Sequence, residues 1–326
     1  MSELTHPAAL IELGRVGDEG LPMRPDPGFR EEIDLCRRWG FDIETAGDRF
    51  RLRFDDEQLI SQWIQKETPP IAWDTLRAEG FLSLQSTNTQ ARLLAERGAP
   101  GGTLVFAEEQ TGGKGRQDRT WHSPAGAGLY CTLIVRPKQP QRFWPLLTHV
   151  ASIALVEALR GLWDQHVFSS PLDADIKWPN DVLLSNKKCA GILLEALWDD
   201  ARSAAALIGF GVNVHEGSVP IDLTGNATCV DAMAHTRVPR RKLLVQYLRH
   251  FQICYLMFEQ GRHADVLEQW KRRSSMWTGT HVFIGKGEGR REAVTCGLSS
   301  LGALMVRNAD GNVETLLAED VSVSRN

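Results

Sequence analysis

The sequence lacks the features that would place the chain in a membrane or an oxidising compartment, or coat it in positive charge. No apolar run approaches the roughly 18 residues that span a bilayer, and the N-terminus has neither a basic start nor an apolar stretch, so no signal peptide is expected. Six scattered cysteines form no CxxC pair, which favours reduced thiols in a cytoplasm over disulfides or zinc. A formal net charge of -4 argues against wholesale nucleic-acid binding.

The composition is that of an ordinary globular protein. Hydrophobic residues make up 42% of the 326 positions, and this length predicts two or three domains. The pattern of apolar residues, prolines and glycines divides the chain into three blocks, at residues 1–65, 75–275 and 278–326.

The first block predicts two helices and a β-hairpin. Ala9, Leu10 and Leu13 have helical spacing, and a second helix is expected over 29–39. Two short alternating segments then flank Ala46-Gly47-Asp48. Helix, helix and hairpin is the outline of a winged helix-turn-helix.

The second and third blocks differ in their periodicity. The second predicts an α+β domain, a mixed sheet with helices packed on one face. The third predicts a small SH3-like β-barrel with strands over 280–284, 293–298, 303–307, 313–317 and 321–323. In the second block, strands are expected over 103–107, 129–136, 175–178, 181–184, 189–198 and 204–214, and helices over 88–97, 144–163, 240–260 and 264–273.

The densest polar cluster is a loop that directly follows a predicted strand, residues 110–121. Its glycines allow backbone N–H groups to approach a ligand, and Lys114, Arg116 and Arg119 add positive charge, which suits phosphate oxygens. A flexible basic surface loop explains the same residues equally well. The segment is neither a Walker loop nor a dinucleotide fingerprint.

Further polar or small-residue segments each allow a functional and a structural interpretation. Lys177 ends an apolar strand, where it could bind a carboxylate or phosphate, but Pro179-Asn180-Asp181 also reads as a simple turn. Ser86-Thr87-Asn88 could line a polar pocket or cap a helix. Small residues within 188–195 and 208–213 indicate close approach to the strand backbone, or ordinary core packing.

Taken together and in this order, these segments resemble the biotin protein ligases. The resemblance covers the central block and continues through the C-terminal barrel, and the series is far more specific than any one motif. Its motifs are Ser-Thr-Asn at 86–88, GxGR at 113–116 ending in Arg-Thr-Trp at 119–121, HSPxGxGLY at 122–130, KWPND at 177–181, KxAGILLE at 188–195 and GxGVN at 209–213.

The resemblance implies a class II synthetase-like central sheet and a two-step reaction. Biotin and ATP, with Mg²⁺, would give biotinyl-5′-adenylate, and a lysine of the biotin carboxyl carrier domain of acetyl-CoA carboxylase would then accept the biotin. A cytoplasmic enzyme that forms at least a weak homodimer is implied as well.

The resemblance also assigns residues. Lys177, Arg116 and Arg119 would be catalytic, and Asp181 is a candidate magnesium ligand. The biotin site would comprise Ser86, Thr87, Asn88, Gln110, Lys114, Gly115, Arg116 and Lys177, and the ATP and adenylate site Gly113, Arg116, Arg119, Trp121, Lys177, Asn180 and Asn213.

The chain departs from the family pattern in two places. Asp118 replaces a glycine of the phosphate loop, which would either weaken adenylate retention or pre-order the loop by pairing with Arg119. Residues 16–28 hold three prolines and three glycines where a complete winged helix-turn-helix needs a helix and its turn. Glu31, Glu32 and Asp34 would repel phosphate. We therefore expect a degenerate winged helix that does not bind DNA. The alternatives are a bifunctional ligase and repressor, and a lipoate or octanoyl ligase.

Overall fold

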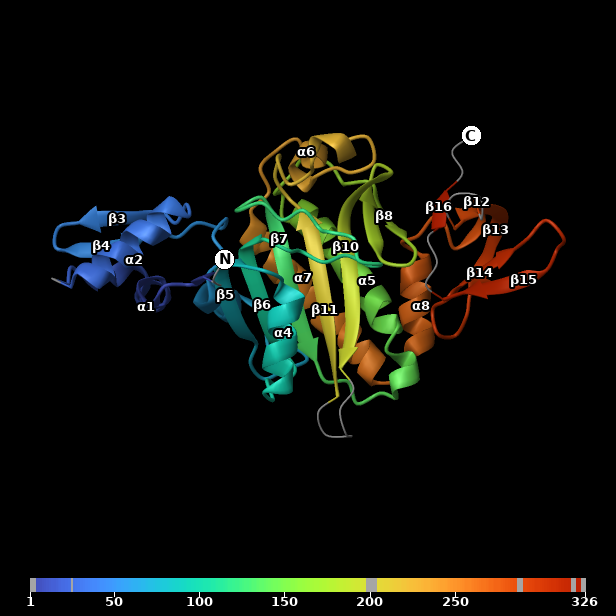
Figure 1. The fold of residues 1–326 in the computed structure, drawn as a ribbon, viewed down its shortest axis with the longest axis horizontal. Coiled ribbons are helices and arrows are strands. Elements are labelled where there is room, and N and C mark those ends of the chain that lie inside the picture. Colours follow the sequence, from blue (N-terminus) through green and yellow to red (C-terminus); the bar gives the residue numbers. More distant parts are fainter. Residues whose placement is uncertain (1–3, 25, 198–203, 286–289, 318–320, 324–326) are drawn as a thin grey trace.

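A computed structural model of the chain describes residues 4–24, 26–197, 204–285, 290–317 and 321–323. Within these residues the strands form three sheets, of eight, five and three strands. The largest sheet stands in the middle of the molecule, between the N-terminal elements and the C-terminal sheet (Figure 1).

The central sheet has the strand order β1-β5-β6-β7-β11-β10-β9-β8. Only β5 and β6 pair in parallel among these neighbours. The sequence did not predict β5, whose first half is polar or small and lacks an apolar run. The strands are β1 (Leu4–Thr5), β5 (Arg77–Leu84), β6 (Thr103–Gln110), β7 (Gly128–Val135), β8 (Ala174–Lys177), β9 (Asp181–Leu184), β10 (Lys187–Leu197) and β11 (Ala205–Asn213).

Helices cover both faces of this sheet. α5 (Leu146–Asp164), α7 (Arg240–Glu259) and α8 (His263–Lys271) share the large apolar core on one face. α4 (Thr87–Glu96) lies on the opposite face, in front of the sheet in Figure 1. The predicted α+β class with a mixed sheet is confirmed, and the expectation that helices lie on one face needs this correction.

The reason for the second helical layer lies in β6. Its Leu104 and Phe106 belong to the core beneath α5 and α7, whereas Val105 and Ala107 pack with Ala91 of α4. Apolar side chains at consecutive positions require cover on both faces of a strand, unlike the alternation of a half-exposed strand.

α5 is the predicted long apolar helix. By length and composition it could cross a membrane, but 72% of that window is buried inside the protein. It packs against α7, α8 and the strands of the central sheet, as a core helix does.

The N-terminal elements contain the predicted pieces. α1 (Ala8–Val16) and α2 (Pro27–Arg38) flank a 3-10 turn at Gly17–Glu19 and a two-residue strand, and among the described residues between them no α-helix occurs. The expectation that the prolines and glycines prevent a helix there is confirmed. The three-stranded sheet has the order β2-β4-β3, with β2 (Leu21–Pro22), β3 (Ile43–Ala46) and β4 (Arg49–Leu52).

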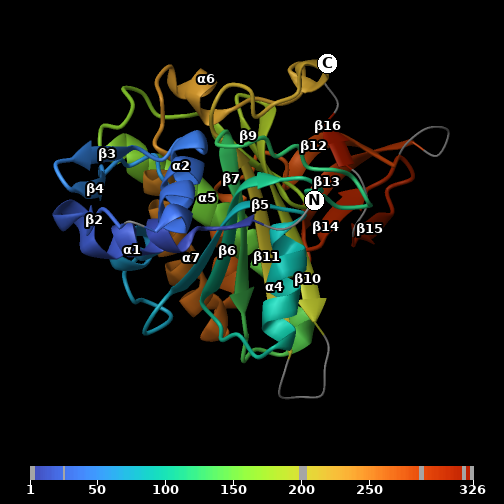
Figure 2. The same cartoon turned by 60° about the vertical axis from the view of Figure 1, so that its left-hand side comes forward.

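These N-terminal elements are built into the central domain. β1 pairs with β5, and α3 (Ser61–Glu67), which the sequence did not predict, crosses the expected boundary at residue 65. Within α3, Trp63 joins the N-terminal core whereas Ile64 joins the main core. A helix that packs into both cores couples the two units, and Figure 2 shows α1 and α2 beside the central sheet.

The C-terminal sheet contains five antiparallel strands in the order β15-β14-β13-β12-β16, and all five had been predicted. The small helix α6 (Val230–Ala234) precedes α7 and was not predicted. The strands are β12 (Thr278–Ile284), β13 (Arg291–Leu298), β14 (Leu304–Arg307), β15 (Val313–Leu316) and β16 (Val321–Val323).

Candidate functional site

A cavity of about 490 Å³ lies where the β6–β7 loop, the β8–β9 turn and the segment after β11 meet. Gly285 and Val321 of the C-terminal sheet also reach it. Gly113 does not line it. The predicted site residues that do are Ser86, Thr87, Asn88, Gln110, Lys114, Gly115, Arg116, Arg119, Trp121, Lys177, Asn180, Asp181 and Asn213.

One end of the cavity is a buried polar cluster at the start of α4. Ser86 stands at the N-cap position of α4, as the capping interpretation predicts, but its side chain makes no cap hydrogen bond. Gln110 caps the helix instead, since its Oε1 accepts from the Thr87 backbone N–H at 2.8 Å. Its Nε2 donates to Ser123 Oγ at 2.9 Å. The amide of Gln110 is therefore held at both ends.

Asn88 is oriented by two side chains that the sequence did not single out as site residues. The Thr132 hydroxyl, fully buried in β7, donates to Asn88 Oδ1 at 2.7 Å and lies 2.9 Å from Thr87 Oγ1. Asn88 Nδ2 donates to Glu195 Oε2 at 3.2 Å. A lone threonine inside an otherwise apolar strand is the sequence signal that could have identified Thr132.

The strand glycines make room for these groups. A Cβ on Gly209 would lie 2.1 Å from Asn88 Oδ1, and a Cβ on Gly211 would lie 2.5 Å from the Trp121 indole. A Cβ on Gly191 would also contact this ring, at 3.1 Å. The prediction that something approaches these strands closely is confirmed, and the approaching groups are Asn88 and Trp121.

The other end of the cavity is cationic. Arg116 donates from Nη1 to Asn180 Oδ1 at 3.1 Å, which connects the β6–β7 loop to the β8–β9 turn. Asn180 in turn donates to the carbonyl of Ile192 at 2.8 Å. The Lys177 side chain forms no hydrogen bond or ion pair with any described residue, so its ammonium group has its donors available to a ligand in the cavity that it lines.

The loop itself is a tight hairpin. Lys114 and Thr120 form an isolated antiparallel β-bridge, and the Gly115 N–H donates to the carbonyl of Arg119 at 2.6 Å. Gln117 and Asp118 both have positive φ, of 55° and 56°. Asp118 therefore adopts a left-handed backbone conformation. A glycine, which the family pattern has at this position, adopts that conformation without the steric penalty of a Cβ atom. Arg119 donates to Gln117 Oε1 at 3.0 Å.

Gly113 shapes the loop instead of lining the cavity. A Cβ there would lie 2.4 Å from the carbonyl oxygen of Trp121, whose N–H donates to the Gly113 carbonyl at 2.9 Å. Only a glycine allows the two arms of the hairpin to approach this closely.

Asp181 forms an ion pair with the nearby Lys188. Its Oδ1 lies 2.6 Å from Lys188 Nζ, and this ammonium also lies 5.3 Å from the centroid of the Trp121 ring. Among the described residues no group of three or more His, Cys, Asp or Glu side chains could hold a metal ion. The donors present do not fit a metal held by the protein alone, and Asp181 as a magnesium ligand stays a prediction.

The C-terminal sheet supports the strand end that carries Lys177. The carbonyl of Gly302 accepts from Trp178 Nε1 at 3.1 Å and from His149 Nε2 at 3.0 Å. Burial lowers the pKa of His149 to about 4, so its ring is neutral and donates from Nε2. Cys131 also lines the cavity, and burial raises its pKa, which keeps it a neutral thiol rather than a nucleophile.

The arrangement is matched by known proteins. The biotin/lipoate A/B protein ligase family model matches residues 81–213. The bifunctional ligase/repressor BirA of Bacillus spizizenii is 30% identical over 242 residues, which are 74% of this chain and 72% of that protein. The chain belongs to the biotin protein ligases.

Two further similarities agree with this membership. The biotin--[acetyl-CoA-carboxylase] ligase of Paracoccus denitrificans is 32% identical over 69% of this chain and 92% of that protein. The biotin protein ligase from Aquifex aeolicus in complex with biotin and ATP is 25% identical, with a TM-score of 0.63 over 76% of this chain and 99% of that chain. The resemblance drawn from the motifs is confirmed.

Proposed function

We propose that this chain activates biotin with ATP and transfers it to a lysine of the biotin carboxyl carrier domain of acetyl-CoA carboxylase. In the first step a biotin carboxylate oxygen forms a bond to the α-phosphorus, and the bond to the β-phosphate oxygen breaks, releasing pyrophosphate. In the second step the lysine nitrogen forms an amide bond to the biotin carbonyl carbon, AMP leaves, and the amine loses its proton.

The observation that carries the proposal is the convergence of Lys177, Arg116 and Arg119 on one cavity whose opposite end is a buried amide and hydroxyl cluster. Two anions must meet in the first step, so cations placed between them lower its barrier. Lys177 is assigned to both the carboxylate and the α-phosphate. The arginines are assigned to the phosphate and to covering the adenylate.

The polar cluster is assigned to the biotin head group. A ureido group presents N–H donors and a carbonyl acceptor, and the side chains of Ser86, Thr87, Asn88 and Gln110 supply the matching partners. Trp121, Asn180, Asn213 and the loop at Gly113 are assigned to the nucleotide, with Lys114 and Gly115 between the two parts. Mg²⁺ is assigned as part of the nucleotide substrate.

The Thr132→Val variant tests the head-group assignment. Valine keeps the shape but leaves Asn88 Oδ1 without its donor, so we expect the KM for biotin to rise about tenfold, or about 1.4 kcal/mol, with little change in the KM for ATP. Steady-state pyrophosphate release measures both constants. Thr295→Val, at a buried threonine of the C-terminal sheet, is the control, and an unchanged KM for biotin in Thr132→Val contradicts the assignment.

The substrate is tested against the lipoate alternative. Pyrophosphate release by the purified chain with ATP is expected to depend on biotin and to resist competition by excess lipoate. Lipoate-dependent release in the absence of biotin would instead favour a lipoate or octanoyl ligase.

We further propose three units, at residues 1–65, 75–275 and 278–326, a cytoplasmic location and a homodimer formed through sheet edges. The N-terminal unit is proposed as a degenerate winged helix without DNA binding. Residues 1–60 hold 14 Asp and Glu against eight Arg and no Lys, which opposes contact with phosphates. The Arg37 side chain donates hydrogen bonds to the carbonyl of Ile43 and to the Thr45 hydroxyl within the same unit.

The similarity to a bifunctional ligase/repressor makes DNA binding the second candidate function. A gel shift on the promoter of the cell's own biotin-synthesis operon, with biotin and ATP present, is expected to show no specific complex. A specific complex that resists competitor DNA would establish the repressor alternative.

A further inference from the structure

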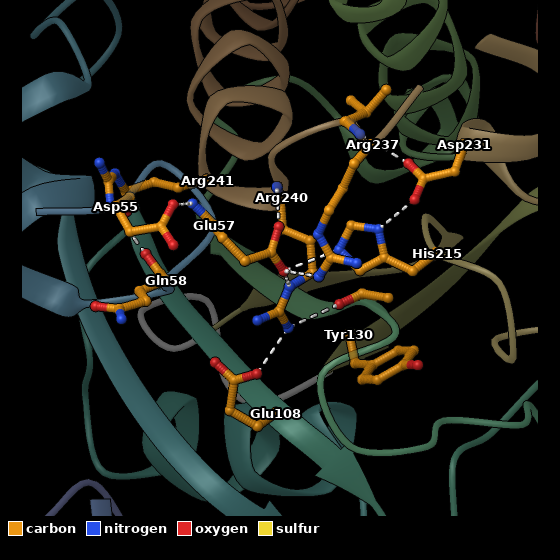
Figure 3. A network of polar contacts seen from close by, with 12 residues as sticks. Asp55, Glu57, Gln58, Glu108, Tyr130, His215, Asp231, Arg237, Arg240 and Arg241 are labelled. Carbon is orange, nitrogen blue, oxygen red and sulfur yellow. Dashed lines mark hydrogen bonds and ion pairs between the residues drawn. The ribbon is translucent and has the colours of Figure 1, made fainter. Parts of the chain in front are cut away.

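A buried polar network joins residues 55–58, the connector between the N-terminal elements and α3, to the start of α7 and to the segment after β11. Figure 3 shows the Glu57 carboxylate between the side chains of Arg240 and His215. Glu57 Oε1 lies 2.8 Å from His215 Nε2 and also accepts from Arg240 Nε. Its Oε2 accepts from the Arg240 backbone N–H at 3.2 Å.

The connector is held firmly where it carries Glu57. The Arg241 side chain is fully buried and donates to the carbonyls of Asp55 and Gln58, the latter at 3.1 Å. It also donates to Asp56 Oδ1 at 3.1 Å. Because the residues on both sides of Glu57 are held, its backbone is held as well, and its carboxylate is positioned by its own contacts with His215 and Arg240.

His215 is enclosed by acidic groups. Its Nδ1 lies 2.8 Å from Asp231 Oδ2, so both ring nitrogens face carboxylate oxygens. Burial alone would raise the pKa of Glu57. The hydrogen bond from His215 and the positive charge of Arg240 together outweigh this effect, so the pKa of Glu57 lies below its ordinary value. The charge of Arg240 is also paired with Glu108, at 2.6 Å.

His215 in turn holds a wall of the cavity. The backbone N–H of His215 donates to the carbonyl of Ala127 at 2.8 Å, and the backbone carbonyl of His215 accepts from Ser218 Oγ at 2.6 Å. Ser218 lines the cavity together with Val219 and Pro220. The connector therefore reaches the cavity wall through one buried imidazole.

This wall follows Asn213, which is assigned above to the nucleotide. Along β11, Gly209 lies beneath Asn88, Gly211 lies beneath Trp121, and Asn213 is followed two residues later by His215. At about 3.4 Å per residue, about 14 Å separates Gly209 from Asn213. A disturbance at His215 is thus expected to affect the nucleotide much more than the biotin head group.

We propose that Glu57 is a positioning residue for the adenylation step, which holds the nucleotide wall of the cavity in place through His215 and Arg240. The proposal rests on the function proposed above. It gives the N-terminal elements a task in catalysis, since their connector supplies the carboxylate. Removing that carboxylate leaves His215 Nε2 without its acceptor and frees the segment after β11.

Glu57→Ala and Glu57→Gln test the proposal in the full chain. We expect the KM for ATP to rise about tenfold in Glu57→Ala and about threefold in Glu57→Gln, which retains an amide oxygen as acceptor, while the KM for biotin stays within about twofold. Calorimetric ATP affinity should fall in the same order. Glu12→Ala, which removes an exposed ion pair with Arg24 in the N-terminal elements, should change neither constant.

Unchanged ATP affinity in Glu57→Ala overturns the proposal. So does an equal loss in both KM values with a lowered melting temperature, because that pattern indicates a purely structural role. Absence of biotin-dependent pyrophosphate release by the unsubstituted chain instead refutes the proposed function alone, since the ATP affinities still decide the role of Glu57.

Discussion

Lys177→Ala is expected to abolish adenylate formation, with biotin-dependent pyrophosphate release falling at least about 100-fold. Lys177 ends β8 at the cavity and its side chain has no partner among the described residues, so its charge is available to both reacting anions. Without it, the biotin carboxylate and the α-phosphate meet with their repulsion uncompensated. A coupled pyrophosphate assay at saturating biotin and ATP measures the loss.

Lys66→Ala provides the matched control, since Lys66 is exposed on α3 and makes no contact with the cavity. It should retain the rate of the unsubstituted chain. Normal pyrophosphate release from Lys177→Ala would remove Lys177 from the catalytic assignment and leave that role to the other cations that line the cavity, Lys114, Arg116, Arg119 and Lys188.

Arg116→Gly is expected to separate synthesis from retention of the adenylate. The Arg116 side chain ties the β6–β7 loop to Asn180, so its loss opens the cavity while Lys177 remains. Pyrophosphate release should stay within a few-fold, and the adenylate should leave at least about tenfold faster, because a mixed anhydride is protected only while the loop covers it.

Rapid gel filtration of the enzyme after a single turnover measures the fraction of adenylate that stays bound. Arg116→Lys keeps the charge but not the planar donor group, and an intermediate retention is expected. Retention equal to that of the unsubstituted chain in Arg116→Gly would show that the loop does not depend on this residue to hold the intermediate.

The sequence was most informative where local pattern and chemistry coincide. The apolar runs over 129–136 and 144–163 became β7 and α5, and the polar motifs converged on a single cavity. Small residues at 209 and 211 indicated close approach, although only the structure shows that Asn88 and Trp121 are the groups that approach.

What the sequence could not predict depends on long-range pairing. Glu57, Glu108, His215, Asp231 and Arg240 are spread over 184 positions and share no local spacing, yet they form one network. Helix α3 was missed because its apolar residues serve two different cores, which blurs the amphipathic pattern of a single buried face.

In the proposed reaction, this cavity makes biotinyl-5′-adenylate and delivers biotin to a carrier lysine. Mass spectrometry of a biotin carboxyl carrier domain, incubated with the purified chain, biotin, ATP and Mg²⁺, tests it most directly. We expect one added biotinyl group on a single lysine, dependent on ATP and absent with Lys177→Ala. An unmodified carrier domain, or equal labelling by the Lys177→Ala variant, would contradict it.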